Sequence, residues 1–336
     1  MGTHNSVREV SGIKPHAVPE EVITATEPLL LKGLVAHWPV VQAGGESPEA
    51  ADRYIRQFYQ NATVGAFFGD ADAAGRVFYN EDMSGFNYQP AIVKLDMVLD
   101  RLMQHLNEQP APAVYLGSTE VDSCLPGFRA ENDIDFGVSD PLASIWIGNR
   151  THIAAHHDVP DNIACCAVGR RRFTLFPPSE VQNLYIGPLD FTPAGQTISM
   201  VDFSAPDFDK FPRFREALKS AQVAEMEPGD AIFIPSMWWH HVQALDAFNV
   251  LVNYWWQKSP AFMGAPINVL EHALLSLRDL PSEQRKAWHE LFKFYIFDFE
   301  PDSIAHIPEN RRGILSAIDE TAARKLRARL LNKLNR

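Results

Sequence analysis

The chain carries a block of short β-type runs between residues 143 and 257, and this block limits the fold more than any other feature. The runs are rich in β-branched and aromatic residues and are bounded by Gly, Pro, Asn or Asp: ASIWIG, NIACCAV, RFTLFPP, DAIFIP and NVLVNYWW. Short strands separated by turn residues are typical of an antiparallel sandwich or barrel. We therefore predict a mainly β fold with its core at about residues 143–257.

Helical patterns flank this block on both sides. SPEAADRYIRQFYQ and AIVKLDMVLDRLMQHL come before it, and INVLEHALLSLRDL, SEQRKAWHELFKFYIF and ETAARKLRARLLNKLNR come after it, each with apolar residues three or four positions apart. We predict one domain over residues 1–266, in which an N-terminal α/β elaboration joins the β core. Residues 267–336 form a predicted C-terminal helical segment, whose last helix has a leucine stripe suited to core packing or dimerisation.

Composition and charge disfavour several classes of protein. The 336 residues have a formal net charge of −12, whereas a general nucleic-acid binder needs a basic face. The longest apolar stretch, near the N-terminus, is interrupted by charged residues and prolines, so we expect no membrane span. The polar first twenty residues are unlike a signal peptide. The three cysteines fit neither a disulfide framework nor a CxxC metal pattern. We expect a cytoplasmic protein without nucleic-acid or membrane partners.

The stretch AAHHDVPDN, residues 154–162, contains the first candidate metal ligands. Successive side chains of a strand point to opposite faces, so His156 and Asp158 share a face and His157 points away. Such a pair can offer one imidazole nitrogen and one carboxylate oxygen to the same ion. Alone, a His-x-Asp pair is more often a surface pair or a hydrogen-bonded core pair, so a second element is needed.

The second element is EPGDAIFIPSMWWHHVQ, about eighty residues further along the chain. Pro-Gly-Asp at residues 228–230 predicts a tight turn into a strand that ends at His240 and His241. Alternation allows one of these two histidines to face inward. Two imidazoles and a carboxylate on one side of a metal ion leave its other side open, as in the facial triad of non-haem Fe(II) oxygenases.

With these elements, residues 143–257 resemble the Jumonji C, or cupin-like, family of Fe(II)- and 2-oxoglutarate-dependent oxygenases, and within it the asparaginyl hydroxylases. The resemblance is carried by HHDVPDNIACCAVGRRRFTLFPP, VDFSAPDFDKFPRF, MEPGDAIFIPSMWWHH and NVLVNYWW, and more loosely by LLLKGLVAHWP near the start. It implies a double-stranded β-helix, or jelly-roll, core. It also implies that His156, Asp158 and His240 bind the iron, with His157 and His241 pointing outward or lying behind the ligands.

The resemblance implies a cation for the distal carboxylate of 2-oxoglutarate, since a buried charge must be paired. In the family this is a lysine or arginine early on the strand that follows a tight turn. In AVGRRRFTLFPP, Arg171 has the parity of the apolar Phe173 and Leu175, which predicts an inward direction, and a guanidinium can hold a carboxylate with two hydrogen bonds. The alternative is a basic hairpin tip in solvent.

Further positions match cosubstrate or pocket residues of the family: Asn162 and Asn253 near the metal, Tyr115 near the distal carboxylate, and Trp255 at the pocket mouth. Each has an ordinary alternative as a core residue. The family also has a cosubstrate-contacting threonine three residues before the first histidine ligand, where this chain has Ile153. Either a two-residue insertion brings Thr151 to that place, or the contact is absent.

These features predict an Fe(II)/2-oxoglutarate-dependent dioxygenase, a hydroxylase acting on a protein or peptide side chain or on a small molecule. Two alternatives stay open: a metal-binding cupin of another class (an isomerase, a lyase or a sensor), and a partner-binding protein with a vestigial site. Asp158 and an inward Arg171 favour the oxygenase. GRVFYNEDMSGFNYQP is a candidate cover for the pocket, with a packed surface loop as the alternative. Family analogy suggests a homodimer through the C-terminal helices.

Overall fold

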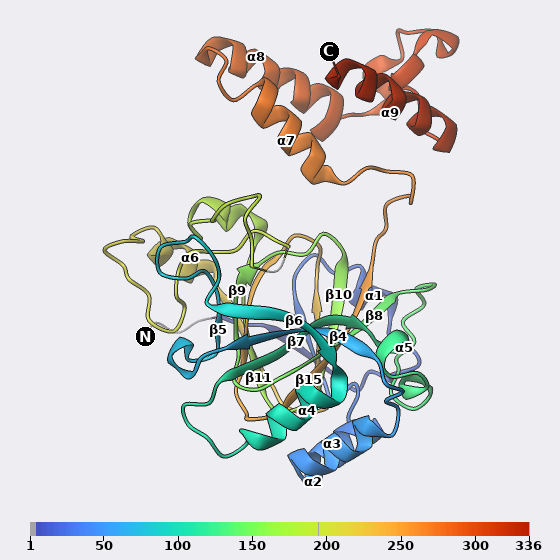
Figure 1. Ribbon diagram of the computed structural model, residues 1–336. Helices are drawn as coiled ribbons and strands as arrows, with labels where there is room; N and C mark the ends of the chain where they lie inside the picture. The colour runs from blue at the N-terminus through green and yellow to red at the C-terminus, as the bar shows by residue number, and fades with distance from the viewer. Residues whose placement is uncertain (1–4, 194, 336) are drawn as a thin grey trace. The chain divides into compact units, whose positions relative to one another are not determined.

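The computed structural model of this chain describes residues 5–193 and 195–335. Contacts between residues divide the chain into two compact units, with unit 1 ending at Gln257 and unit 2 beginning at Lys258 (Figure 1). The domain boundary predicted between residues 266 and 267 therefore falls inside unit 2. Among the described residues, helices of the length and apolarity needed to cross a membrane are absent.

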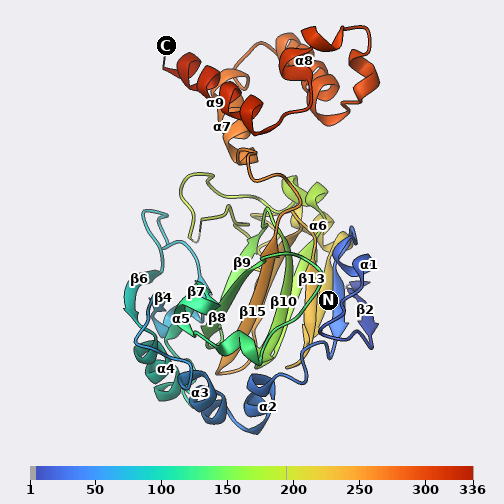
Figure 2. The same cartoon turned by 90° about the vertical axis from the view of Figure 1, so that its right-hand side faces the viewer.

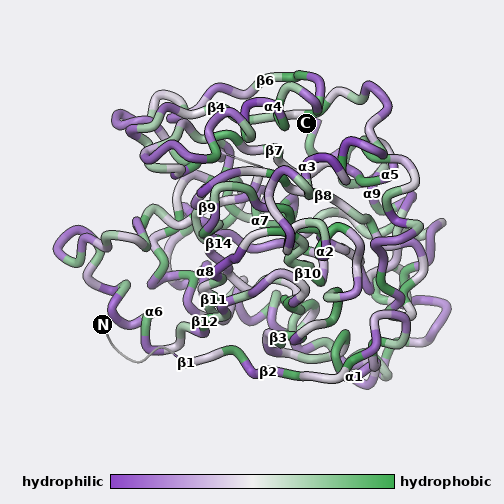
Figure 3. Tube along the Cα trace, turned by 90° about the horizontal axis from the view of Figure 1, so that it is seen from below, coloured by the Kyte–Doolittle hydropathy of each residue, from purple (hydrophilic) through white to green (hydrophobic). Residues whose placement is uncertain are grey.

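Unit 1 is built on two β-sheets. Over the described residues, one sheet has six strands in the order β1 (Asn5–Ser6), β12 (Gln222–Met226), β11 (Arg171–Phe176), β14 (Trp239–Ala244), β9 (His152–His156) and β5 (Arg76–Val77). The other has nine, in the order β2 (Arg8–Ser11), β3 (Leu29–Lys32), β13 (Ala231–Ile234), β10 (Asp161–Val168), β15 (Asn249–Trp256), β8 (Leu142–Gly148), β7 (Ala113–Glu120), β4 (Thr63–Gly69) and β6 (Tyr88–Lys94). Figure 3 shows β9, β14, β11, β12 and β1 following one another across the first sheet.

The strands from β8 to β15 form the predicted jelly roll. Along the chain they belong mostly in turn to the nine-stranded and the six-stranded sheet, and neighbouring strands within this part of each sheet are antiparallel. The apolar runs recognised in the sequence form β8, β10, β11, β13 and β15. The fold class expected from the sequence, a mainly β double-stranded helix with flanking helices, is confirmed.

The helices of unit 1 are short and lie outside the β core. They are α1 (Glu20–Ile23), α2 (Pro39–Glu46), α3 (Pro48–Arg56), α4 (Leu95–Gln104), α5 (Val121–Cys124) and α6 (Phe214–Ser220). Single 3₁₀ turns cover Ala71–Ala73, Phe128–Ala130 and Pro178–Gln182. Figure 2 shows α2, α3 and α4 together beside the larger sheet, where α2 packs on β10 and α4 on β7.

Both faces of the central strand β10 are buried, which explains its unbroken apolar sequence. All eight residues of β10 are buried. One face joins a core cluster under the helices that contains Trp38, Ile55 and Leu95. The other face joins a cluster between the two sheets that contains Phe173 and Ile232. Side chains from the inner faces of the two sheets thus fill part of the space between them. The candidate site lies in the rest of that space.

Two expectations for local structure were wrong. The helical pattern that begins at residue 91 contains the end of β6, because residues 88–94 pair with β4 before α4 begins at Leu95. The strand expected to run from the turn at residues 228–230 to His240 is two strands, β13 and β14, which belong to different sheets. Pro235 has no N–H for a ladder, and Met237 adopts a φ of 67°, so the chain turns there and crosses between the sheets.

Unit 2 consists of helices: α7 (Pro266–Ser276), α8 (Ser282–Phe292), a π-helix at Lys293–Phe297, 3₁₀ turns at Pro301–Ile304, Glu309–Arg311 and Gly313–Leu315, and α9 (Glu320–Leu334). Among its described residues, Ile304 and Ala323 are the only buried hydrophobic ones. The three helical segments predicted from apolar spacing are therefore present, but the apolar faces of these helices are largely uncovered.

Candidate metal centre

Three side chains of unit 1 converge in a way that could hold a metal ion. One ligand atom from each of His156, Asp158 and His240 lies within 4.8 Å of the others, and within the described residues they form the one such group of three or more His, Cys, Asp and Glu. His156 and His240 are partners in the antiparallel pairing of β9 with β14. Two strands distant in the sequence thus bring the two imidazoles together.

Asp158 reaches this cluster from a turn, whereas alternation within a strand was expected to place it there. β9 ends at His156, and Asp158 lies two residues beyond it. The main-chain oxygen of Asp158 accepts a hydrogen bond from Met237 N at 2.8 Å. This bond ties the turn after β9 to the turn before β14, so the backbone fixes the carboxylate next to His240.

The two imidazoles share one hydrogen-bond pattern. Nδ1 of His156 lies 2.8 Å from the main-chain oxygen of Ala154, and Nδ1 of His240 lies 3.0 Å from that of Trp238. A carbonyl oxygen can only accept, so both Nδ1 atoms carry the proton and donate it. The Nε2 lone pairs are then free for a metal, and Nε2 of His240 lies 3.7 Å from Asp158 Oδ2.

Burial keeps His240 neutral. Loss of solvent, followed by the nearby His156, lowers the pKa of His240 to about 4. At neutral pH this side chain is therefore an imidazole with a free electron pair, the form that binds a metal. With the Asp158 carboxylate, the three residues offer two nitrogens and one oxygen to one side of a divalent cation. None of the three supplies a donor to the other side of the cation.

The other members of the two histidine pairs pack against aromatic rings. The ring of His157 meets Trp239 edge to face at 4.6 Å, and the ring of His241 stacks on Phe203 at 4.8 Å. Burial lowers the pKa of His241 to about 3. These contacts give both residues a packing role outside the ligand cluster.

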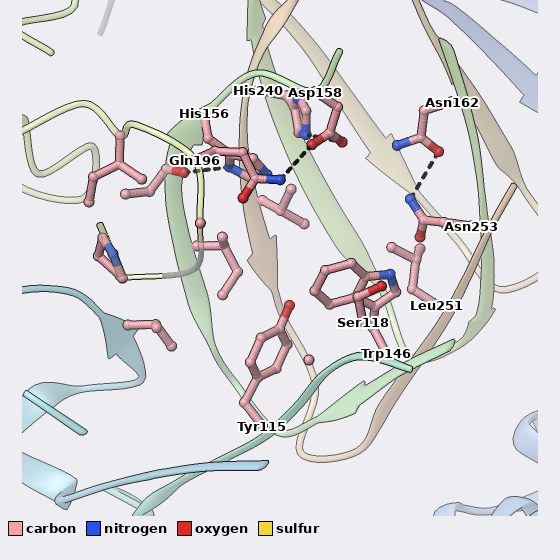
Figure 4. A pocket seen from close by; sticks show the side chains of 18 of the residues that line it. Tyr115, Ser118, Trp146, His156, Asp158, Asn162, Gln196, His240, Leu251 and Asn253 are labelled. Carbon is pink, nitrogen blue, oxygen red and sulfur yellow. Dashed lines mark hydrogen bonds and ion pairs between the residues drawn. The ribbon is translucent and has the colours of Figure 1, made fainter. Parts of the chain in front are cut away.

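A cavity of about 530 Å³ lies beside the cluster. Its lining includes the three candidate ligands and all the other site residues selected from the sequence, namely Arg171, Asn162, Asn253, Tyr115 and Trp255. Figure 4 shows His156, Asp158 and His240 together at one end of this pocket and Tyr115 at the other. The candidate metal ligands and the polar side chain of Tyr115 therefore lie at opposite ends of the pocket.

Arg171 supplies a buried positive charge to the pocket. It is 3% exposed, and its Nε has no hydrogen-bond partner among the described residues. Its neighbours in the RRR run lie at the surface in ion pairs, Arg170 with Asp246 and Arg172 with Glu225. Desolvation lowers the pKa of Arg171, yet an arginine stays charged in a protein. A buried cation without a protein anion is costly, so this end of the pocket suits an anionic ligand.

Tyr115 lies near this cation. It is buried, and its ring stacks on Trp146 at 6.0 Å. Burial raises the pKa of its hydroxyl, and this effect is larger than the opposing effect of the Arg171 charge. The phenol is therefore protonated and able to donate a hydrogen bond. A donor next to a guanidinium again fits a carboxylate.

Unsatisfied amide and indole groups line the same pocket. Asn253 Nδ2 donates to Asn162 Oδ1 at 2.9 Å, while the Oδ1 atom of Asn253 is buried with no partner among the described residues. The same is true of the indole nitrogens of Trp146 and Trp255, whose rings meet edge to face at 5.8 Å. Buried polar atoms in native proteins normally have partners, so these groups are candidates for hydrogen bonds to a bound ligand or water.

Sequence reasoning missed Trp146 and Gln196. Trp146 pairs with Leu251 across β8 and β15, and Ser144, two residues before it on the same strand face, pairs with Asn253. Trp146 could therefore have been found from its parity along the strand. Gln196 belongs to an irregular loop and donates to Asp158 Oδ1 at 3.2 Å. No periodic pattern marks such a residue.

A bulge in β9 settles which residue near the first ligand faces the pocket. His240 pairs with His156, but Val242 pairs with Ile153, so β9 has one extra residue between the two pairs. Ile153 consequently lines the pocket together with His156. Thr151 is buried, with its hydroxyl 3.4 Å from the main-chain oxygen of Asn149. Thr151 is not among the residues that line the pocket.

The candidate cover segment contacts the loop that borders the pocket. The Tyr88 hydroxyl donates to the main-chain oxygen of Pro193, and the Tyr79 hydroxyl to that of Phe191 at 2.5 Å. Pro193 and Val77 both line the pocket. Part of the segment therefore borders the cavity and holds the neighbouring loop.

Comparisons with known proteins match a family model and several curated relatives. The model of the family described as "Cupin-like domain" matches residues 15–262. Lysine-specific demethylase 8 of Xenopus tropicalis is 28% identical over 243 residues, 70% of this chain and 49% of that protein. tRNA wybutosine-synthesizing protein 5 of Gallus gallus is 32% identical over 165 residues, 45% of this chain and 46% of that protein. HSPB1-associated protein 1 of Homo sapiens is 32% identical over 115 residues, 34% and 23% respectively. Each match spans about half or less of the relative's length.

Proposed function

This chain belongs to the cupin-like domain family, and from that premise we propose that it is an Fe(II)- and 2-oxoglutarate-dependent oxygenase that hydroxylates a C–H bond. The observation that carries the proposal is a single pocket with a two-histidine, one-carboxylate cluster and a buried, unpaired Arg171. A metal-dependent cupin whose ligand carries no anionic group away from the metal gains nothing from such a cation. We therefore favour the oxygenase over an isomerase, a lyase or a sensor.

The residues fit an iron ion by the chemistry of their donors. His156 and His240 offer Nε2 atoms whose tautomer is fixed by main-chain oxygens, and Asp158 offers Oδ2. Two imidazoles and one carboxylate on one side are the donor set of non-haem Fe(II) oxygenases. When bound there, iron supplies the oxygen activation that couples decarboxylation of 2-oxoglutarate to hydroxylation of a substrate.

The other pocket residues would bind and orient the cosubstrate. Arg171 would pair with its distal carboxylate through parallel N–H donors, with the protonated Tyr115 hydroxyl as a further donor. The Asn162 side chain, held by the hydrogen bond from Asn253, would face the cosubstrate near the metal end. Trp146 and Trp255 would form walls that exclude water, which strengthens every charge interaction inside.

The relatives named lysine-specific demethylase 8 and tRNA wybutosine-synthesizing protein 5 match only part of the chain. Hydroxylation of an N-methyl carbon and hydroxylation of a side-chain carbon begin with the same C–H bond cleavage. We therefore propose a protein or peptide side chain, or a small molecule, as the group that enters the pocket.

We also propose that unit 2 joins two copies of the chain. Its helices leave large apolar side chains exposed, among them Leu275 at 80%, Phe297 at 75%, Ile296 at 64% and Leu331 at 60%. Monomeric proteins rarely expose so many apolar groups on one small unit. A second copy carries the same surface and would cover it by two-fold symmetry.

We place the protein in a reducing cytoplasm. Support comes from the three cysteines, Cys124, Cys165 and Cys166, which are all free and buried. Disulfide-free chains with this cysteine usage are typical of reducing compartments.

The test is release of succinate and carbon dioxide from 2-oxoglutarate, with and without added Fe(II). The wild type should show iron-dependent release, and His156→Ala should abolish it because one ligand is lost. His157→Ala is the matched control, since His157 packs on Trp239 and should leave the ligand set intact. Equal release by the wild type and His156→Ala would refute the assignment.

A further inference from the structure

The two oxygens of the Asp158 carboxylate have different partners. Oδ2 faces the imidazole of His240, with 3.7 Å between Oδ2 and Nε2. Oδ1 accepts a hydrogen bond from Gln196 Nε2 at 3.2 Å. Figure 4 shows Gln196 extending from its loop to Asp158 beside His156. One oxygen is thus directed to the metal position and the other is held by an amide.

The backbone on both sides of Gln196 is anchored, although its side chain is exposed. Before it, the main-chain oxygen of Pro193 accepts from the Tyr88 hydroxyl. After it, Ser199 N donates to the main-chain oxygen of Ala155 on β9 at 2.7 Å, and the Ser199 hydroxyl donates to that of Leu184 at 2.5 Å. The loop is therefore fastened to the strand that carries His156, which places the amide of Gln196 over Asp158.

We propose that Gln196 is a positioning residue that restricts Asp158 to one-oxygen coordination of the metal ion. The proposal rests on the proposed function. A carboxylate that is free to rotate can bind an ion through both oxygens, which takes up one of the positions that a chelating cosubstrate needs. A hydrogen bond to Oδ1 opposes that rotation.

The chemistry of glutamine suits this role. An amide donates to a carboxylate without adding a charge, so Asp158 keeps its full negative charge for the ion. A lysine or arginine in the same place would form an ion pair and repel the cation. Partners of this kind, which hold a metal-binding side chain, commonly change metal affinity about 10- to 100-fold when removed.

The experiment uses Co(II) as the probe in the full chain, without cosubstrate. A visible-absorption titration gives both the dissociation constant of the ion and a band shape that depends on coordination number. Gln196→Met keeps the length of the side chain and removes the donor. Gln243→Met is the matched control, because that glutamine contacts His152, which is not a candidate ligand.

Gln196→Met should bind Co(II) about 10-fold more weakly than the wild type and give a changed band shape, while Gln243→Met should match the wild type. Gln196→Ala, which removes the amide altogether, should reproduce both changes. Equal dissociation constants within about twofold and identical spectra for the wild type and both Gln196 variants would overturn the proposal.

The two proposals fail in different ways. If the wild type binds Co(II) and turns over 2-oxoglutarate with iron, but the Gln196 variants behave as wild type, only the role of Gln196 is refuted. If the Gln196 variants change as expected but iron supports no turnover, the oxygenase is refuted and the positioning role stands. A wild type that binds no Co(II) refutes both.

Discussion

His156 and His240 lie opposite each other on the antiparallel strands β9 and β14, with ring centroids 4.3 Å apart. The pairing register of these strands therefore sets the distance between two candidate ligands that are far apart in the sequence. A one-residue slip would turn one imidazole to the other face of the sheet. The metal centre is thus a property of the jelly-roll register, and Asp158 completes it from the turn that follows β9.

Replacing Arg171 should separate its role in binding from its cost in stability. Arg171→Met should raise the KM for 2-oxoglutarate about 10- to 100-fold, because a charged hydrogen-bond partner of the carboxylate is lost. The same change should raise the free energy of unfolding of the cosubstrate-free protein by about 1–3 kcal/mol, because a buried unpaired group is removed. Steady-state kinetics and urea unfolding measure the two effects. Arg172→Met, at the surface, is the control. An unchanged KM would contradict the role of Arg171.

Replacing Gly169, in the turn that leads into Arg171, should lower the free energy of unfolding. Its φ is +71°, and an added Cβ would lie 2.4 Å from Asn249 Oδ1 and 2.6 Å from the Phe248 main-chain oxygen. Gly169→Ala should therefore destabilise the protein by about 1–3 kcal/mol through backbone strain, with the clash in addition. Gly12→Ala is the matched control, since Gly12 has a φ of +77° but no atom within 4 Å of the added Cβ. Similar unfolding midpoints for both variants would show that the clash is unimportant.

The metal-free protein should lose stability in mild acid. Burial lowers the pKa of His241 to about 3, whereas in the unfolded chain it has its ordinary value of 6.5. Between these values the unfolded chain binds more protons, so stability is complete above pH 6.5 and falls as the pH decreases. The loss is about 1.4 kcal/mol per pH unit for this group. Urea unfolding from pH 7.5 to 4.5 measures it, and His241→Phe should reduce the slope by that amount. An unchanged slope in the variant would contradict this assignment.

If unit 2 forms the dimer interface, a single charge placed on its apolar surface should dissociate the dimer. Leu331→Glu should convert the dimer to a monomer, because a carboxylate on the covered apolar face would lose its solvent without gaining a partner. Leu142→Glu is the control: Leu142 is also exposed, at 50%, but belongs to unit 1. Light scattering coupled to size-exclusion chromatography gives the mass. A wild type of monomer mass, or a dimer unaffected by Leu331→Glu, would argue against this interface.

Much of the fold could be predicted because its strands are short runs of β-branched and aromatic residues bounded by turn residues. Those runs located β8, β10, β11, β13 and β15. Prediction failed where the chain departs from regular pairing. Pro235 and the positive φ of Met237 split one expected strand into two, and the bulge in β9 turns Ile153 toward the pocket. Both depend on pairing partners that the local sequence does not specify.

The residues of the candidate site could also be predicted only in part from the sequence. His156, Asp158 and His240 could be named because the ligand types and their family spacing are in the sequence. Gln196 could not, since it reaches Asp158 from a loop whose path depends on tertiary contacts with Tyr88 and Ala155. Residues that hold ligands from irregular segments leave no periodic signal.

The most direct test of the central claim is an anaerobic titration of 2-oxoglutarate into the Fe(II)-loaded protein, followed by visible absorption. If three side chains bind one ferrous ion and leave its other side open, the keto acid chelates the ion and a visible band rises to saturation at one equivalent per chain. The band should be absent in His240→Ala. Iron bound at one equivalent without any band on addition of 2-oxoglutarate would mean that the open side does not exist, and the account would be wrong.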